Sequence, residues 1–483
     1  MLPAPVSRFL PVFLPLLLSC IIFSGCGVRE EDKVEKKVIS PEYFSSSSEL
    51  SKYFMADSDC LNQSGASDIR QGLIYSMQGG SIKPVMANLS SVGSQNSLHT
   101  PFIKATEFAM ITEKTCRIDD DTTSCEKEME IKQSPVPLKI CDSNPRYQRN
   151  SLESIGLTSL VHLNSVFRFY EDIRGSHMPL SAVKLLVLPS FYSRYPSSSK
   201  IKTDNLAFFP SLENEPTVVV FPKGAVGALL WPDTNLWEYP WVLSHEGAHH
   251  VFRSYFSQAS SDTSQTIFNN YFSSNADVKE ETLRSEENTL ALAGSARVVP
   301  LTTIISTMNE GFADLFAFYA QGARSDLVVN LKCFDKSRNL LSGYFGNGVR
   351  KQLTRDVVSR FFSSTYGEAT TSCEVPNFQD VHSIGSIIAY GLNRIFDASY
   401  DVKASRDPAK IKGSLLMKWL DLIPKSVSQS QTSQGLLQLF VKAGISAAAK
   451  GGNILSTEQC YIVRDIFPAY SDAFIGNSLF ICQ

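Results

Sequence analysis

The sequence predicts an α+β fold, in which a lobe containing a mixed sheet is followed by a lobe made only of helices. β-Branched runs broken by glycine and proline, such as Thr217 to Gly224, are typical of strands and lie near the middle of the chain. Beyond residue 310, apolar residues recur at helical spacing instead. The chain has 483 residues and is 43% hydrophobic, which is enough to bury a large core in two or three domains.

Residues 1–25 have the features of an export signal peptide. A short basic start precedes an apolar run from Phe9 to Phe23, which is too short and too broken by prolines for a permanent membrane helix. Its end, Phe23-Ser24-Gly25-Cys26, resembles a bacterial lipobox. That resemblance implies that Cys26 is lipidated and anchors the protein in the bacterial cell envelope, and the glycine after it favours the outer membrane. An ordinary secretory signal, giving a periplasmic or extracellular protein, is the alternative.

Two regions follow the signal before the central lobe begins. Residues 26–55 are dense in charge and serine, and we expect them to form a tether behind the lipid anchor. Residues 56–150 combine short mixed segments with four cysteines, which predicts a small, partly β accessory region stapled by disulfides. Proximity in the sequence alone suggests three pairs: Cys116 with Cys125, Cys333 with Cys373, and Cys460 with Cys482.

The central lobe is predicted to span residues 151–253. Apolar residues at helical spacing indicate a helix over 157–174. Strands are expected over 183–191 and 217–224, with a further extended segment at 204–209 between them. These elements predict a twisted sheet beside the helix that comes next.

The helix that comes next carries the pattern H-E-x-x-H, formed by His245, Glu246 and His249. Pro240 suits the first turn of this helix, and apolar residues flank the motif. Residues four apart lie one above the other on a helix, so the two imidazoles converge and could provide half of a zinc site. The glutamate lies close enough to act on a metal-bound water without being a ligand. Taken alone, the motif is equally compatible with histidines that are satisfied by hydrogen bonds.

A second helical pattern, from Met308 to Tyr319, carries two carboxylates on an otherwise apolar segment. Buried carboxylates are costly unless they are paired or bound to a metal. Glu310 could therefore complete a His, His, Glu ligand set and leave the fourth zinc position open. Asp314, one turn on, could accept the outer N–H of a ligating histidine. The alternative is that both acids face solvent near a helix N-terminus.

Together these residues resemble the gluzincin metallopeptidases and, within them, the thermolysin-like fold. The shared features are His245-Glu246-x-x-His249 followed by Asn309-Glu310-x-x-x-Asp314. The resemblance implies that Glu310 is the third zinc ligand, with Asn309 and Asp314 around it. The two motifs lie much farther apart here than in thermolysin itself, because a polar stretch at 254–300 separates them. That insertion could be a lid or a solvated loop.

Residues 301–483 are expected to form the helical lobe. Its predicted helices beyond the ligand helix span 349–362, 386–396, 414–422, 435–449 and 458–467. Within this lobe, His382 resembles the histidine that stabilises the oxyanion in thermolysin-like enzymes, with Asp380 as the group that orients it. The glycine that follows comes one position early for the family pattern, and a core or helix-capping histidine is the alternative.

The segment around Asn205 and Ala207 resembles the edge strand that binds the substrate backbone in thermolysin-like enzymes. The resemblance implies that these two residues contact a peptide, although an ordinary hairpin is equally compatible with the pattern. The G-x-M-E-N string of gluzincin aminopeptidases is absent from the corresponding stretch. That absence favours an endopeptidase.

The function expected from these residues is zinc-dependent hydrolysis of peptide bonds in the cell envelope. One zinc ion would be the cofactor, a peptide or protein the substrate, and the membrane a partner only through the lipid. The net charge of −3 gives no indication of nucleic-acid binding. Two alternatives remain open, a non-catalytic zinc-binding lipoprotein and a hydrolase of cell-wall cross-links.

Overall fold

The structure is a computed structural model. It describes residues 64–66, 69–78, 81–108, 111–113, 129–131, 136–149, 151–174, 179–187, 192–193, 201–202, 207–212, 215–220, 235–256, 301–323, 338–345, 348–363, 378, 381–429 and 432–483. The predicted signal peptide, lipidation site and tether lie outside these residues, as does nearly all of the predicted insertion. Within the described residues, no helix is both long and apolar enough to cross a membrane.

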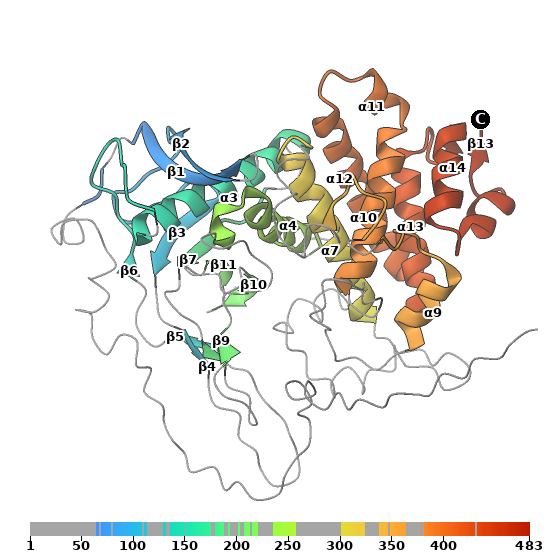
Figure 1. Ribbon diagram of the computed structural model, residues 1–483, viewed down its shortest axis with the longest axis horizontal. Coiled ribbons are helices and arrows are strands. Elements are labelled where there is room, and N and C mark those ends of the chain that lie inside the picture. The colour runs from blue at the N-terminus through green and yellow to red at the C-terminus, as the bar shows by residue number, and fades with distance from the viewer. Residues whose placement is uncertain are drawn as a thin grey trace, which may run out of the picture. The chain divides into compact units, whose positions relative to one another are not determined.

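A five-stranded mixed sheet forms one part of the molecule (Figure 1). Its strands, in spatial order, are β10 (Ala207–Leu212), β11 (Glu215–Val220), β7 (Val183–Val187), β3 (Ile103–Phe108) and β6 (Val136–Pro137). The three central strands run parallel, and the two edge strands pair with them antiparallel. The centre of the sheet is therefore the part that needs cover on both faces, and the buried residues of β7 and β11 are almost all apolar.

The sheet crosses the boundary that the sequence suggested at residue 150. Strand β3 belongs to the predicted accessory region, yet it pairs directly with β7 of the predicted central lobe. The two regions therefore share one sheet. Strands β1 (Gln71–Gln78) and β2 (Ser81–Asn88) form a separate antiparallel hairpin. Short two-stranded pairings join β4 (Ile111–Glu113) to β5 (Met129–Ile131) and β8 (Tyr192–Ser193) to β9 (Ile201–Lys202).

Helices α3 (Leu152–Arg174) and α4 (Pro240–Phe256) lie against this sheet and against each other. A partly buried ion pair fixes the approach to α4. Arg149 bonds both carboxylate oxygens of Glu238, which ends the 3-10 turn η2 (Leu236–Glu238), and one of these bonds is 2.8 Å long. Because Glu238 is fully buried and paired, the chain enters α4 in one defined direction.

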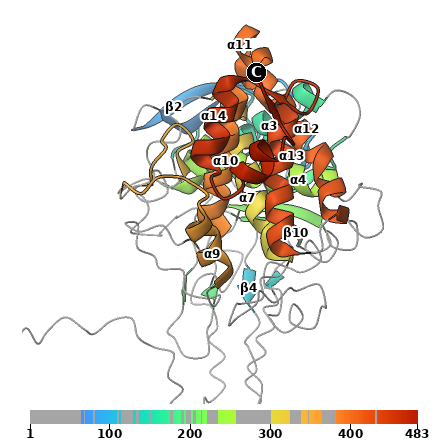
Figure 2. The ribbon, with the colours of Figure 1, turned by 90° about the vertical axis from the view of Figure 1, so that its right-hand side faces the viewer.

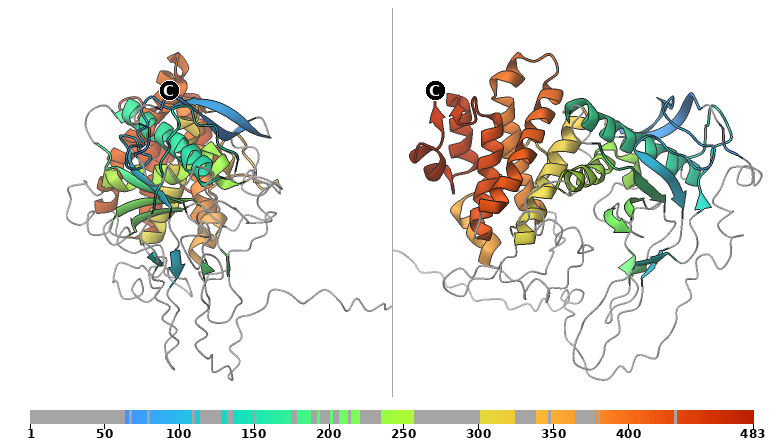
Figure 3. Two further views of the ribbon diagram at one scale, coloured as in Figure 1. Left: turned by 90° about the vertical axis from the view of Figure 1, so that its left-hand side faces the viewer. Right: turned by 180° about the vertical axis from the view of Figure 1, so that it is seen from behind.

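The remaining helices form the second part of the molecule (Figures 1 and 2). They are α7 (Leu301–Ala320), α9 (Arg355–Ser363), α10 (Val381–Asp397), α11 (Tyr400–Ala404), α12 (Pro408–Gln429), α13 (Ser433–Ala448) and α14 (Thr457–Ile466). Helix α7 lies between α4 and α10, as Figure 3 also shows from behind. Nearly all its side chains are buried, which explains why its sequence is apolar almost all the way round.

The described residues thus form a mixed helix and sheet structure that is consistent with the predicted α+β class. Most predicted helices are present and longer than expected. One prediction fails at its start, because the helix expected over 349–362 begins only at Arg355. The residues before it form a hairpin instead, in which Tyr344 pairs with Arg350 and the N–H of Phe345 donates to the carbonyl of Val349.

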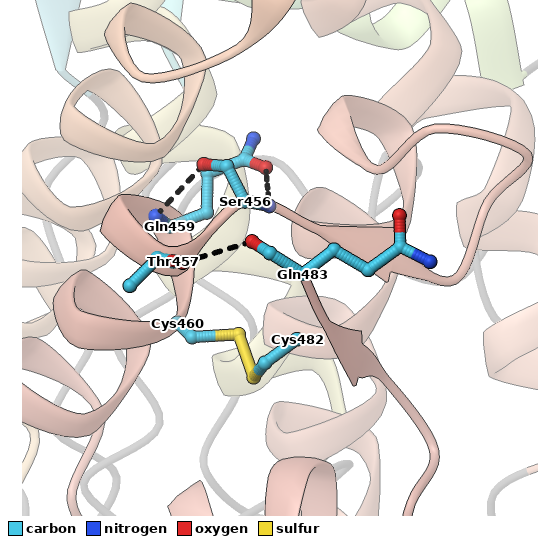
Figure 4. The surroundings of a disulfide bond; sticks show 6 residues. All are labelled: Ser456, Thr457, Gln459, Cys460, Cys482 and Gln483. Atoms are coloured by element: carbon cyan, nitrogen blue, oxygen red, sulfur yellow. Dashed lines mark hydrogen bonds between the residues drawn. A yellow bond between two sulfur atoms is a disulfide. The ribbon is translucent and has the colours of Figure 1, made fainter.

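A disulfide closes the carboxyl-terminal end of the chain (Figure 4). Cys460 of α14 bonds Cys482 of β13 (Ile481–Cys482), which confirms this predicted pair. Strand β13 runs parallel to β12 (Ile454–Leu455), and the hydroxyl of Thr457 donates to the last carbonyl of the chain at 2.9 Å. Cys141 is also disulfide-bonded. The other two predicted pairs lie outside the described residues.

Candidate metal centre

Helix α4 brings His245 and His249 together, as their spacing predicts. Their Nε2 atoms lie 3.1 Å apart, and the rings meet almost at right angles. Both side chains are largely buried, at 5% and 12% exposure. Two imidazole nitrogens therefore point at one location inside the protein, on the face of α4 that packs against α7.

Helix α7 brings Glu310 to the same location. Its Oε2 lies 3.2 Å from His245 Nε2, and its Oε1 lies 3.7 Å from His249 Nε2. In a tetrahedral site with metal–ligand bonds of about 2.0 Å, two ligand atoms lie about 3.3 Å apart. The two imidazole nitrogens are 3.1 Å apart, each lies 3.2 or 3.7 Å from one of the two carboxylate oxygens, and one ligand atom from each residue lies within 4.8 Å of the other two. His245, His249 and Glu310 therefore form a group that could hold a metal ion.

Two further residues of α7 orient the histidines from outside. The Nδ1 of His249 lies 3.0 Å from Asn309 Oδ1, so its N–H donates to the amide and its Nε2 keeps a free lone pair. The Nδ1 of His245 lies 3.0 Å from Asp314 Oδ1, although the ring is turned so that the N–H is poorly aligned with that oxygen. Asn309 and Asp314 thus occupy the positions around the ligands that the sequence predicted for them.

Arg338 is a member of this site that the sequence did not reveal. Its guanidinium bonds Glu310 Oε2 at 3.2 Å and Asp314 Oδ1 at 3.3 Å, and it lies 3.3 Å from His245 Nε2. The side chain is only 6% exposed and lies over the ring of Trp241. No helical or strand pattern marks residue 338 in the sequence, so no local signal pointed to it.

The charges of the site are balanced only in part by Arg338. Two buried carboxylates, Glu310 and Asp314, face one guanidinium. Burial alone would lower the pKa of His245, but Asp314 and Glu310 outweigh it and raise that pKa to about 9. Burial would raise the pKa of Glu310, but the histidines around it, His382 first, hold that pKa well below its usual value. The site therefore favours one more positive charge, which a proton on His245 or a metal cation could supply.

His249 differs from His245, because its outer partner is an amide rather than a carboxylate. Burial is the largest influence on its ring and lowers the pKa to about 4. The ring is therefore neutral near pH 7, which is the form that binds metals.

His382 lies on the first turn of α10, with its Nε2 3.4 Å from Glu310 Oε2. Its side chain is 44% exposed, so it borders the site from the solvent side and is not a core residue. Helix α10 can approach α7 this closely because Gly311 faces Gly385. A Cβ on Gly311 would lie 2.8 Å from the Gly385 carbonyl oxygen. These two glycines thus set the distance between His382 and Glu310.

The other predicted site residues are placed less fully. Glu246 follows His245 on α4 and is partly exposed. Ala207 begins β10, which is an edge strand of the sheet, as expected for the segment. Asn205, Asp380 and Cys26 lie outside the described residues.

No model of a known protein family matches this chain, and no curated protein is similar to it.

Proposed function

We propose that the protein is a zinc-dependent metalloendopeptidase of the gluzincin type, with a thermolysin-like arrangement of its two lobes. The observation that carries this proposal is that His245, His249 and Glu310 each bring one ligand atom within 4.8 Å of the other two. Three protein ligands leave one zinc position for water, which is the arrangement of catalytic rather than structural zinc sites. Two nitrogens and one carboxylate oxygen also suit zinc better than calcium or magnesium.

A bound zinc ion would polarise the scissile carbonyl and lower the pKa of its water. Glu246, next to a ligand on α4, would serve as the general base toward such a water and as the acid toward the leaving amine. His382 borders the site from solvent and donates to the oxyanion as it forms. Loss of one such donor costs roughly 2.7–4 kcal/mol in other hydrolases.

Arg338 would change partners when the metal binds. Its Nη1 lies near the same nitrogen of His245 that would coordinate zinc. Zinc at that nitrogen would require Nη1 to move away from it. The same Nη1 bonds Asp314 Oδ1, whereas Nη2 bonds Glu310 Oε2, so the guanidinium could keep Glu310 in place through Nη2 while it neutralises the two carboxylates.

The edge strand β10 supports a peptide as the substrate. An edge strand presents unpaired backbone groups, and an extended peptide can add to it as a further strand. By resemblance, Asn205 and Ala207 make these contacts. We further propose that the enzyme is a lipoprotein of the bacterial envelope, anchored through Cys26.

The proposal is tested by pairing zinc analysis with cleavage of a mixed peptide library. The wild-type protein is expected to bind one zinc per chain and to cleave internal peptide bonds, and a chelator is expected to stop cleavage. Glu246→Gln is expected to keep its zinc and lose turnover. Glu458→Gln, the same change on the exposed surface of α14, is the matched control and should keep both.

Three results would overturn the peptidase. Retained zinc without any cleavage by the wild-type protein would favour a non-catalytic zinc protein. Cleavage of purified cell-wall sacculi but not of peptides would favour a hydrolase of cell-wall cross-links. A protein that binds no zinc would exclude all three functions.

A further inference from the structure

Arg338 lies on a short segment whose backbone is held by side chains from elsewhere. The Nζ of Lys351 donates to the carbonyl of Asn339, which directly follows Arg338, at 2.7 Å. The Nδ2 of Asn393 donates to the carbonyl of Leu340 at 3.3 Å. Two successive carbonyls after Arg338 are thus bonded to side chains.

Lys351 is an unusual residue to find in this place. It is 1% exposed, and the rings of Phe345 and Tyr390 lie 5.6 and 5.7 Å from its Nζ. Among the described residues, no carboxylate lies within ion-pair distance of it, and its side chain makes one hydrogen bond, to Asn339. A buried ammonium with no carboxylate in direct contact is costly, and burial lowers the pKa of Lys351 to about 7, although the more distant Asp314 acts in the opposite direction.

The backbone of Lys351 is itself fixed, so its side chain can act as a rigid support. Its N–H donates to the carbonyl of Gly343 at 2.8 Å within the hairpin. Two residues on, the N–H of Leu353 donates to the carbonyl of Ile466 at 2.7 Å, which joins the hairpin to the end of α14.

Asn393 is oriented just as firmly. Its Oδ1 accepts from the hydroxyl of Tyr319 at 3.1 Å and from Lys412 at 3.4 Å. With the oxygen used in this way, its NH2 group faces Leu340. Lys412 also bonds Asp397 at 2.7 Å, so the support for this second carbonyl extends over α7, α10 and α12.

We infer that Lys351 is a positioning residue of the metal centre. By holding the Asn339 carbonyl it fixes the backbone that carries Arg338, and it thereby keeps the guanidinium on Glu310 and Asp314. Lys351 touches neither the ligands nor a substrate. Its charge interacts at a distance with Asp314, and its hydrogen bond to the backbone acts through Arg338. Asn393 provides the second, weaker support. The inference rests on the proposed metal centre.

The test is a double-mutant cycle on zinc affinity, measured by competition with a chelating dye. Lys351→Met removes the donor and keeps the aliphatic stem. We expect it to change the zinc dissociation constant at least threefold, in the same direction as Arg338→Met and by a smaller factor. In the Arg338→Met background, Lys351→Met should change it less than twofold, because the group through which it acts is gone.

The matched control is Gln459→Met on α14. Gln459 is buried and also donates from a side chain to a backbone carbonyl, that of Ile395 at 3.2 Å, outside the metal centre. We expect it to lower the melting temperature about as much as Lys351→Met and to leave zinc affinity unchanged. If Lys351→Met does not fold, Lys351→Gln, which keeps a shorter N–H donor, takes its place in the cycle.

The outcomes separate this inference from the proposed function. Equal effects of Lys351→Met with and without Arg338, or no effect on zinc affinity in a folded variant, would overturn the positioning role alone. A wild-type protein that binds no zinc would overturn the metal centre, and the positioning role with it. A change in zinc affinity in Gln459→Met would show that general loosening explains the result, which also overturns the inference.

Discussion

The two faces of helix α4 carry the same residue type in opposite surroundings. On the face toward α7, His245 lies beside two carboxylates, which raise its pKa to about 9. On the face toward α3, His250 lies edge-on to Phe167, with its Nε2 2.7 Å from the carbonyl of Ser181. Burial lowers its pKa to about 4. His250 belongs to the core, although it directly follows the ligand His249.

The difference shows that the side chains of the neighbouring helix determine the pKa and the role of a buried histidine. Helix α7 offers Asn309, Glu310 and Asp314 to one face of α4. Helix α3 offers aromatic and aliphatic side chains to the other, and Gly247 lets it approach closely. A face with carboxylates attracts cations, and a face without them excludes charge.

The largest expected effect on zinc affinity comes from replacing the two adjacent histidines one at a time. His249→Ala should weaken zinc binding at least a hundredfold, since one of four ligands provides roughly 3 kcal/mol of the about 10–16 kcal/mol of a zinc site. His250→Gln should leave the zinc dissociation constant within threefold. Calorimetric titration of the two variants measures both values. Comparable losses of zinc affinity in the two variants would contradict the proposed difference between the two faces of α4.

The second prediction concerns stability in acid and uses His162 of α3, which is also buried. Burial is the main cause that lowers its pKa to about 4 in the folded protein, against about 6.5 in the unfolded chain. The contribution of His162 to the free energy of unfolding has its full value above pH 6.5, where the ring is neutral in both the folded and the unfolded chain. It is lost as the pH falls toward 4, because the unfolded chain then binds a proton that the folded protein does not.

The loss amounts to about 3 kcal/mol over this interval. His162→Gln should therefore lose less stability than the wild-type protein between pH 6.5 and 4, as measured by urea unfolding at several pH values. Parallel pH curves for the two proteins would show that this histidine does not titrate as its surroundings predict.

A smaller effect is expected when a group that orients a ligand is changed. Asp314→Asn removes the charge beside His245 and leaves the side-chain size unchanged. Loss of such an outer partner typically costs about 10–100-fold in metal affinity. The same titration measures it, with Asp472→Asn on the exposed surface as the control. An unchanged dissociation constant would mean that Asp314 only neutralises Arg338.

The smallest effect is expected from a substitution on the face of α4 that packs against α3. A Cβ on Gly247 would lie 2.7 Å from Val166 Cγ1 and 3.3 Å from Leu163 Cδ2. Overpacking of this kind costs about 1–3 kcal/mol, and the better helix propensity of alanine returns up to about 1 kcal/mol. Gly247→Ala should thus lose about 1 kcal/mol of unfolding free energy while zinc affinity stays within threefold. A large loss of zinc affinity would mean that the two faces are not independent.

The ligands could be predicted from the sequence because helix periodicity encodes their relation. His245 and His249 lie four apart on α4, and Glu310 and Asp314 lie four apart on α7, so each pair is a local pattern. The long separation between the two patterns did not matter, because it leaves each helix intact. His250 could be set aside for the same reason, since its position is turned about 100° from that of His249.

Arg338 could not be predicted, because nothing local marks it. It reaches the site from a segment whose position depends on Lys351 and Asn393, and such supports are long-range contacts. The shared sheet was missed for a similar reason. Strand β3 is separated from β7 by β4, β5, β6 and the whole of α3, and parallel pairing across such a connection leaves no trace in either strand's own pattern.

The contact between Gly311 and Gly385 has a consequence for motion. Because the backbones of α7 and α10 nearly touch there, the two helices cannot slide past each other without a collision. A side chain at either position would have to push the two backbones apart. Because Glu310 and His382 lie within three residues of this contact, such a change would carry the imidazole away from the carboxylate.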